Sequence, residues 1–71
     1  MNFATRLKEL RKSKKITQLT LALKLKTNQN TISRYESGER EPGINEIIAI
    51  ADYFDVSVDY LLGVTDNPDI K

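Results

Sequence analysis

Amide, hydroxyl and guanidinium side chains recur at helical spacing in the stretch TNQNTISRYESG, residues 27–38. At 100° per residue, five of them would span one continuous arc of about 140° on a helix; they are Gln29, Asn30, Ser33, Arg34 and Ser37. Ile32 and Tyr35 would fall on the opposite side, where apolar side chains can anchor the helix to a core. The stretch therefore predicts a helix with one polar face and one buried face.

The chemistry available on that arc is hydrogen bonding to the edges of nucleobases. Gln and Asn amides pair bidentately with adenine N6 and N7 in the major groove, and Arg pairs with guanine O6 and N7. A plainly solvated face would favour Glu, Lys and Ala, which have better helix propensity. Helix capping alone would explain Asn28 and Asn30. It does not explain why Gln29, Ser33 and Arg34 align, so we favour base recognition.

The charge of the chain is divided unevenly between its two parts, although the net charge is only +1. Residues 1–40 carry ten Lys or Arg against three acids, a net charge of +7. Residues 41–71 carry one Lys against seven acids, a net charge of −6. A basic first half favours a polyanionic partner, and a solvated surface of uneven charge is the alternative.

Composition excludes several classes of function. The 71 residues suffice for one domain, and the 39% hydrophobic content is that of a globular chain. With no Cys and no His, the chain lacks disulfides, thiolate metal sites and the commonest general base. Without clustered carboxylates as well, we expect no enzyme, cofactor, metal or small-molecule ligand. No apolar run has the length of a membrane span and no signal peptide is visible, so we expect a cytoplasmic protein.

Apolar residues at helical spacing predict an all-α domain of five short helices around one small core. The expected helices are residues 3–13, 18–25, 29–37 (from 28 if Thr27 is the cap), 44–54 (beginning at 44 or 45) and 58–62. Thr17, Asn28 (or Thr27) and Ser57 are the predicted N-caps, and Gly38 is the predicted left-handed stop after the third helix. We expect residues 1–63 to form the domain and residues 64–71 to form a flexible tail or the start of a linker.

The segment TQLTLALKLKTNQNTISRYESGEREP, residues 17–42, resembles the DNA-binding core of the Cro/repressor-type helix-turn-helix family. This family comprises the lambdoid phage repressors and their XRE-like bacterial relatives. The motifs that carry the resemblance are Thr17-Gln18, Leu21-Ala22, Thr31-Ile32-Ser33, Arg34-Tyr35-Glu36, Gly38, Pro42 and VSVDYLLG at 56–63. The resemblance covers roughly residues 3–62, and it implies a compact five-helix, lambda-repressor-like fold with its third helix in the major groove.

The resemblance also implies roles for individual residues. The positions that match base-reading residues are Gln29, Asn30, Ser33 and Arg34. The positions that match contacts to the DNA backbone are Gln18, Asn28, Ser37 and Arg40. Arg11 and Glu36 match a pair that forms a buried, structural salt bridge in relatives. Dimer contacts are expected at Val58, Leu61, Leu62 and Val64.

The function implied is that of a sequence-specific regulator of transcription. We expect a repressor that binds double-stranded DNA as a homodimer at a (pseudo)palindromic operator. An antitoxin or a restriction-modification controller belongs to the same class. A protein-interaction module, antitoxin-like or other, that keeps the fold with weak or no DNA binding is the alternative. The operator sequence, and activation as opposed to repression, stay open.

Three positions depart from the family pattern. Relatives usually have Gly in the turn where this chain has Lys26, which predicts either a left-handed Lys or a different turn. Relatives usually have polar residues where this chain has Leu19 and Leu23. These two are expected either to pack against the first or fourth helix, or to form an exposed apolar ridge that binds a partner or a second copy.

Overall fold

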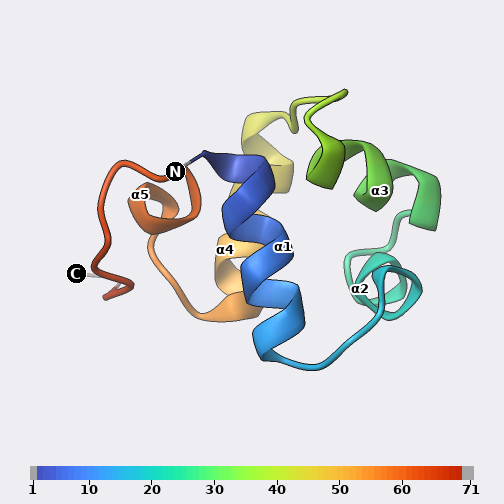
Figure 1. Cartoon of the computed structure of the whole chain (residues 1–71), viewed down its shortest axis with the longest axis horizontal. Helices are drawn as coiled ribbons and strands as arrows, with labels where there is room; N and C mark the ends of the chain where they lie inside the picture. Colours follow the sequence, from blue (N-terminus) through green and yellow to red (C-terminus); the bar gives the residue numbers. More distant parts are fainter. Residues whose placement is uncertain (1, 70–71) are drawn as a thin grey trace.

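The computed structural model describes residues 2–69, which fold into five α-helices (Figure 1). They are α1 (Phe3–Ser13), α2 (Gln18–Lys24), α3 (Gln29–Ser37), α4 (Ile44–Phe54) and α5 (Val58–Leu61). The prediction of an all-α fold is confirmed, and each predicted boundary lies within one residue of the observed one. In this described part of the chain, no helix is long and apolar enough to cross a membrane.

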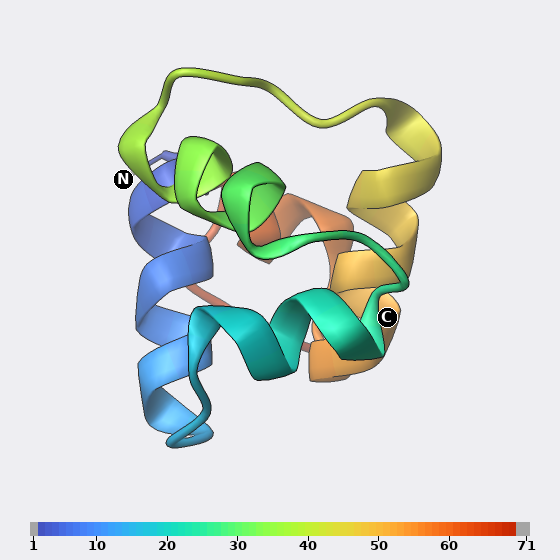
Figure 2. The same cartoon turned by 90° about the vertical axis from the view of Figure 1, so that its right-hand side faces the viewer.

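The helices divide the molecule into two sides. Helices α2 and α3 lie together on one side, and α5 with the C-terminal segment lies on the other (Figure 1). Helices α1 and α4 run between these two sides. When the molecule is turned, α2 and α3 face the viewer (Figure 2). Helix α3 packs on both α2 and α1, and α5 packs on both α4 and α1. This arrangement leaves α2 and α3 with a broad outward surface.

Every helix contributes one fully buried aliphatic side chain to the core. These side chains are Leu7, Leu21, Ile32, Ile50 and Leu61. Because each helix is short, helix propensity alone cannot keep it folded, and burial of these side chains supplies most of its stability. The helices therefore form together or not at all, as expected for a small single core.

Side-chain caps mark where α2, α3 and α5 begin. Thr17, Asn28 and Ser57 each accept a hydrogen bond from the backbone N–H three residues on, which confirms them as N-caps. Asn28, rather than Thr27, caps α3. Gly38 follows α3 with φ of 83°, as predicted for a left-handed stop. These local signals explain why the boundaries could be predicted from sequence.

The turn between α2 and α3 contains a left-handed lysine. Lys26 has φ of 58°, and the turn is closed by a hydrogen bond of 2.9 Å from the N–H of Thr27 to the carbonyl of Ala22. The structure thus has the same left-handed position that relatives fill with Gly, rather than a different turn. A side chain with a Cβ is disfavoured in this conformation, so Lys26 carries a small backbone strain.

The C-terminal segment folds back on the domain around a buried arginine. Arg6 is only 3% exposed, its guanidinium lies 3.7 Å from the ring centroid of Tyr60, and it donates to Asp66 at 3.3 Å. The N–H of Ser57 also donates to the carbonyl of Pro68 at 3.0 Å. The division of the chain at residue 63 stays a prediction, and residues 70–71 of the expected tail lie outside the described residues.

We expect Lys26→Gly to raise the free energy of unfolding by about 0.5 kcal/mol. Relief of left-handed strain contributes about 1 kcal/mol, and the larger entropy of the unfolded Gly chain offsets part of it. Lys8→Gly, in the middle of α1, is the control and should lower stability by about 0.5–1 kcal/mol. Urea unfolding followed by circular dichroism measures both. A less stable Lys26→Gly protein would show that the turn does not strain this residue.

Candidate nucleic-acid interface

The four predicted base-reading residues lie on the outward face of α3. Gln29, Asn30, Ser33 and Arg34 are all exposed, whereas Ile32 and Tyr35 on the other side of the helix are buried. The outward position of α3 is visible in Figure 2. The structure therefore brings the polar arc together on an accessible surface, as the helical spacing predicted. The role of each residue on DNA stays a prediction.

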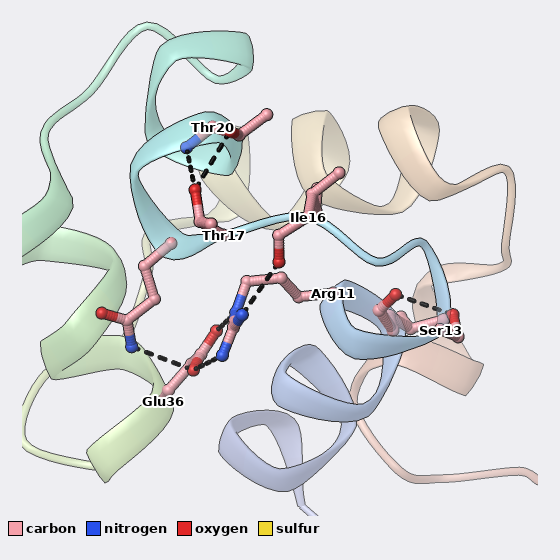
Figure 3. Close-up of polar contacts among 8 residues, drawn as sticks. Arg11, Ser13, Ile16, Thr17, Thr20 and Glu36 are labelled. Carbon is pink, nitrogen blue, oxygen red and sulfur yellow. Dashed lines mark hydrogen bonds and ion pairs between the residues drawn. The ribbon is translucent and has the colours of Figure 1, made fainter.

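A buried ion pair fixes α3 against α1. Arg11 Nε donates to Glu36 Oε2 at 2.6 Å and Nη2 donates to Oε1 at 3.1 Å, while Nη1 donates to the carbonyl of Ile16 at 2.9 Å (Figure 3). The side chains of Arg11 and Glu36 are 13% and 4% exposed. Hydrogen bonding to Glu36 raises the pKa of Arg11 above its ordinary value, although burial opposes this effect. The predicted structural salt bridge is confirmed.

The same carboxylate also holds the beginning of α2. Gln18 Nε2 donates to Glu36 Oε1 at 3.1 Å, and Thr17 caps α2 by accepting from the N–H of Thr20 at 3.0 Å (Figure 3). Three helices thus meet at Glu36, which leaves no unpaired charge there. Gln18 is half-buried and sits at the surface formed by α2 and α3. A contact of Gln18 with phosphate would therefore be rigidly linked to the recognition helix.

Two of the other predicted backbone contacts are engaged within the chain. Asn28 Oδ1 accepts from the N–H of Thr31 at 2.9 Å and from its hydroxyl at 3.0 Å. Its amide NH2 group is the part that remains for a phosphate oxygen. The Ser37 hydroxyl lies 3.1 Å from the Arg34 carbonyl and 3.0 Å from Glu39 Oε1. A nearby carboxylate makes Ser37 a poorer phosphate contact than sequence alone indicated.

A polar pocket of about 290 Å³ lies beside α3. Its rim includes Lys26 and Thr27 from the α2–α3 turn, Arg40 from the following loop and Asn45 from α4. Of these four, only Arg40 was predicted from the sequence to contact DNA. The other three were missed because they converge only when the α3–α4 loop brings α4 next to the turn. Glu46 of α4 also lines the pocket, so the two cations and two neutral hydrogen-bonding side chains would offer phosphate oxygens a surface with one opposing acid.

The predicted dimer contacts are only partly available. Val64 is 73% exposed and Leu62 is 36% exposed, and Val58 is half-buried. For Leu61 the structure corrects the prediction, because its side chain is fully buried in the core. The helical spacing of α5 placed it beside Val58 and Leu62, but the packing of α5 on α1 and α4 turns Leu61 inward.

The two leucines of α2 that depart from the family pattern are exposed. Leu19 is 51% exposed and Leu23 is 68% exposed. The expectation that they pack against the first or fourth helix is therefore wrong. Helix α2 already buries Leu21 and Ala22 completely, and Leu21 lies on the side of the helix away from Leu19 and Leu23.

The sequence of residues 7–61 matches the helix-turn-helix family. This chain belongs to that family. One relative is the uncharacterized HTH-type transcriptional regulator YobD of Bacillus subtilis (strain 168). It is 39% identical to this chain over 69 residues. The match covers 97% of this chain and 62% of that protein, so the chain spans less than two thirds of its relative's length.

Solved structures of helix-turn-helix proteins have the same fold. A transcriptional regulator from Listeria innocua matches with a TM-score of 0.83 and 35% identity, over 87% of this chain and 58% of that one. The P22 c2 repressor protein, in complex with synthetic operator 9T, matches with a TM-score of 0.82 and 31% identity, over 87% of this chain and 94% of that one. The expected lambda-repressor-like fold is therefore confirmed.

We expect Glu36→Ala to lower the free energy of unfolding by about 3 kcal/mol, because it leaves the guanidinium of Arg11 buried without its partner. Thermal and urea unfolding of the free protein measure the loss. Glu39→Ala is the control, since its carboxylate is exposed at the end of α3, and it should change stability by less than about 0.5 kcal/mol. Equal midpoints for the two variants would contradict the proposed importance of the buried pair.

Proposed function

We propose that this chain is the DNA-binding part of a sequence-specific transcriptional regulator, with α3 as the recognition helix in the major groove. The observation that carries this proposal is the exposed arc of Gln29, Asn30, Ser33 and Arg34 on α3. The buried Arg11–Glu36 pair fixes the orientation of that helix. Bases are read best by side chains held on a rigid element, which is the arrangement of this arc.

The surfaces that flank the arc would hold the phosphate backbone. On one side, Gln18 is braced by Glu36 at the beginning of α2. On the other side, Lys26 and Arg40 line the polar pocket beside α3. Contacts of this kind set the position of a protein on the duplex without reading sequence, and they make the affinity depend on salt. The net charge of +7 on residues 1–40 supports this division of labour.

The proposed regulator is a repressor that binds a (pseudo)palindromic operator as a homodimer. Two recognition helices would then enter half-sites about 34 Å apart, one turn of the duplex. The similarity to the P22 c2 repressor supports this proposal, and the exposed Leu62 and Val64 offer apolar surface for a second copy. In this proposal residues 1–63 form the DNA-binding domain, and the segment that follows contacts it through Asp66 and Pro68.

A protein-interaction module without DNA binding is the second candidate, and the exposed Leu19 and Leu23 favour it. Such a module has no need of an accessible amide and guanidinium arc on α3. DNA binding explains that arc, and an additional protein contact on α2 is compatible with it. We therefore place DNA binding first.

Selection from random duplex DNA at near-physiological salt tests the proposal directly. An enriched inverted repeat would support sequence-specific binding as a dimer and would give the half-site spacing. An enriched single half-site would support base recognition and contradict dimerisation of this chain on DNA. A folded protein that enriches no sequence would contradict the proposed function and leave the interaction module as the better account.

We expect Arg34→Ala to weaken binding to the selected sequence far more than to random duplex DNA. A bidentate contact of Arg with guanine contributes about 1–3 kcal/mol of discrimination. Gln18→Ala is the comparison, and it should weaken binding to both duplexes without altering the preferred sequence, because phosphates carry no sequence information. Fluorescence anisotropy with both duplexes measures the two ratios. Equal losses for Arg34→Ala on both duplexes would reassign this residue to the backbone.

A further inference from the structure

Two apolar side chains on α2 lie on the surface one helical turn apart. Leu19 is 51% exposed and Leu23 is 68% exposed, whereas Leu21 and Ala22 are fully buried. At 100° per residue, Leu21 lies on the side of α2 opposite the exposed pair, and Ala22 lies at the edge between the two sides, about 60° from Leu19. We call Leu19 and Leu23 the α2 ridge. Leu21 and Ala22 already pack α2 onto the core, so the stability of the fold does not explain why Leu19 and Leu23 are apolar.

The segment that carries the α2 ridge is basic. Residues 14–28, which comprise α2 and its two flanking turns, contain four lysines and no acid. These lysines are Lys14, Lys15, Lys24 and Lys26, and all four are exposed. Among residues 2–69, the ion pairs are made by other cations. An apolar ridge with unpaired positive charges around it is complementary to a surface that is both apolar and acidic.

We propose that the α2 ridge binds an acidic amphipathic helix of a partner protein. Leu, Ile or Phe side chains of that helix would pack around Leu19 and Leu23, and its Asp and Glu side chains would face the four lysines. Helical partners commonly bind through apolar residues spaced three or four apart, which is the spacing of the α2 ridge. The contact would take place on the domain that carries the recognition helix, next to Gln18 at the beginning of α2.

Neither of the other available occupants fits the α2 ridge as well. The outer surface of duplex DNA is made of phosphate and sugar, and it gains little by covering two leucine side chains. A second copy of this chain, paired symmetrically through α2, would bring the same four lysines from each copy together without any acid. Like charges placed face to face disfavour such an interface.

Helix α4 provides a matched control of opposite charge. Ile44 and Ile48 have the same spacing as the α2 ridge, and they are 65% and 52% exposed. Residues 41–55 around them contain four acids and no Lys or Arg. The two exposed pairs therefore have similar apolar character and opposite surroundings, so a partner's charge should decide between them.

The experiment uses two synthetic amphipathic helical peptides with one leucine pattern, one with Glu and the other with Lys at the polar positions. Amide NMR shifts of the whole ¹⁵N-labelled chain are followed at near-physiological salt. We expect the Glu peptide to shift residues of α2 and the Lys peptide to leave them unmoved. The variant Leu19→Gln/Leu23→Gln should bind the Glu peptide about tenfold more weakly or worse. Ile44→Gln/Ile48→Gln should bind it like the unaltered chain.

Several outcomes would overturn the proposal. The Glu peptide could fail to bind, or it could shift the amide signals of α4 instead of those of α2. The two double variants could also lose affinity for the Glu peptide equally. Dimerisation in sedimentation that disappears in Leu19→Gln/Leu23→Gln would assign the α2 ridge to a second copy. A similar loss of affinity for selected DNA would assign it to the DNA surface. Circular dichroism confirms that both variants fold, and the peptide result is independent of whether DNA binding is found.

Discussion

The structure depends on one buried carboxylate. Glu36 accepts from Arg11 of α1 and from Gln18 of α2 while it sits on α3, so a single charged group joins three helices. A carboxylate that is 4% exposed is costly unless its hydrogen bonds are satisfied. Because this one is satisfied by partners from two other helices, the orientation of α3 is tied to the packing of the whole first half of the chain.

That constraint explains how so small a core can hold a polar helix at the surface. Helix α3 buries the apolar side chains of Ile32 and Tyr35 and exposes its polar arc. Apolar burial alone would allow the helix to rotate about its axis or to slide along it, since two buried apolar side chains specify its orientation poorly. The directional hydrogen bonds of the Arg11–Glu36 pair remove that freedom. The exposed arc is thereby presented in one orientation, as base recognition requires.

The chain also divides its charges between its two parts in sequence. The basic residues lie mainly in α1, α2, α3 and the turns between them, and the acids lie mainly from residue 41 onward. The basic residues thus accompany the first three helices, and the acids accompany α4, α5 and the segment after them. A basic segment of this kind favours a polyanionic partner. This division of charge also gives the exposed apolar pairs on α2 and α4 different preferences for partners.

Much of the fold could be predicted because its signals are local. Thr17, Asn28, Ser57 and Gly38 act on the backbone of their own helix ends, so their types and positions set the boundaries without knowledge of the rest. The polar arc of α3 was likewise predictable from helical spacing. The Arg11–Glu36 pair was not, since twenty-five residues separate its members, and only the resemblance to the family indicated it.

The remaining features depend on how distant segments pack. Arg6 looks like a surface residue of an amphipathic helix, but the return of the chain past Tyr60 and Asp66 buries it. The sequence indicated Leu61 as a dimer contact, but the packing of α5 on α1 buries its side chain. The hydrophobicity of Leu19 and Leu23 did not show whether their side chains would be buried or exposed. By itself the sequence determined the helices, their ends and the chemistry of α3; the tertiary structure decided which side chains face water, because burial depends on every neighbouring element at once.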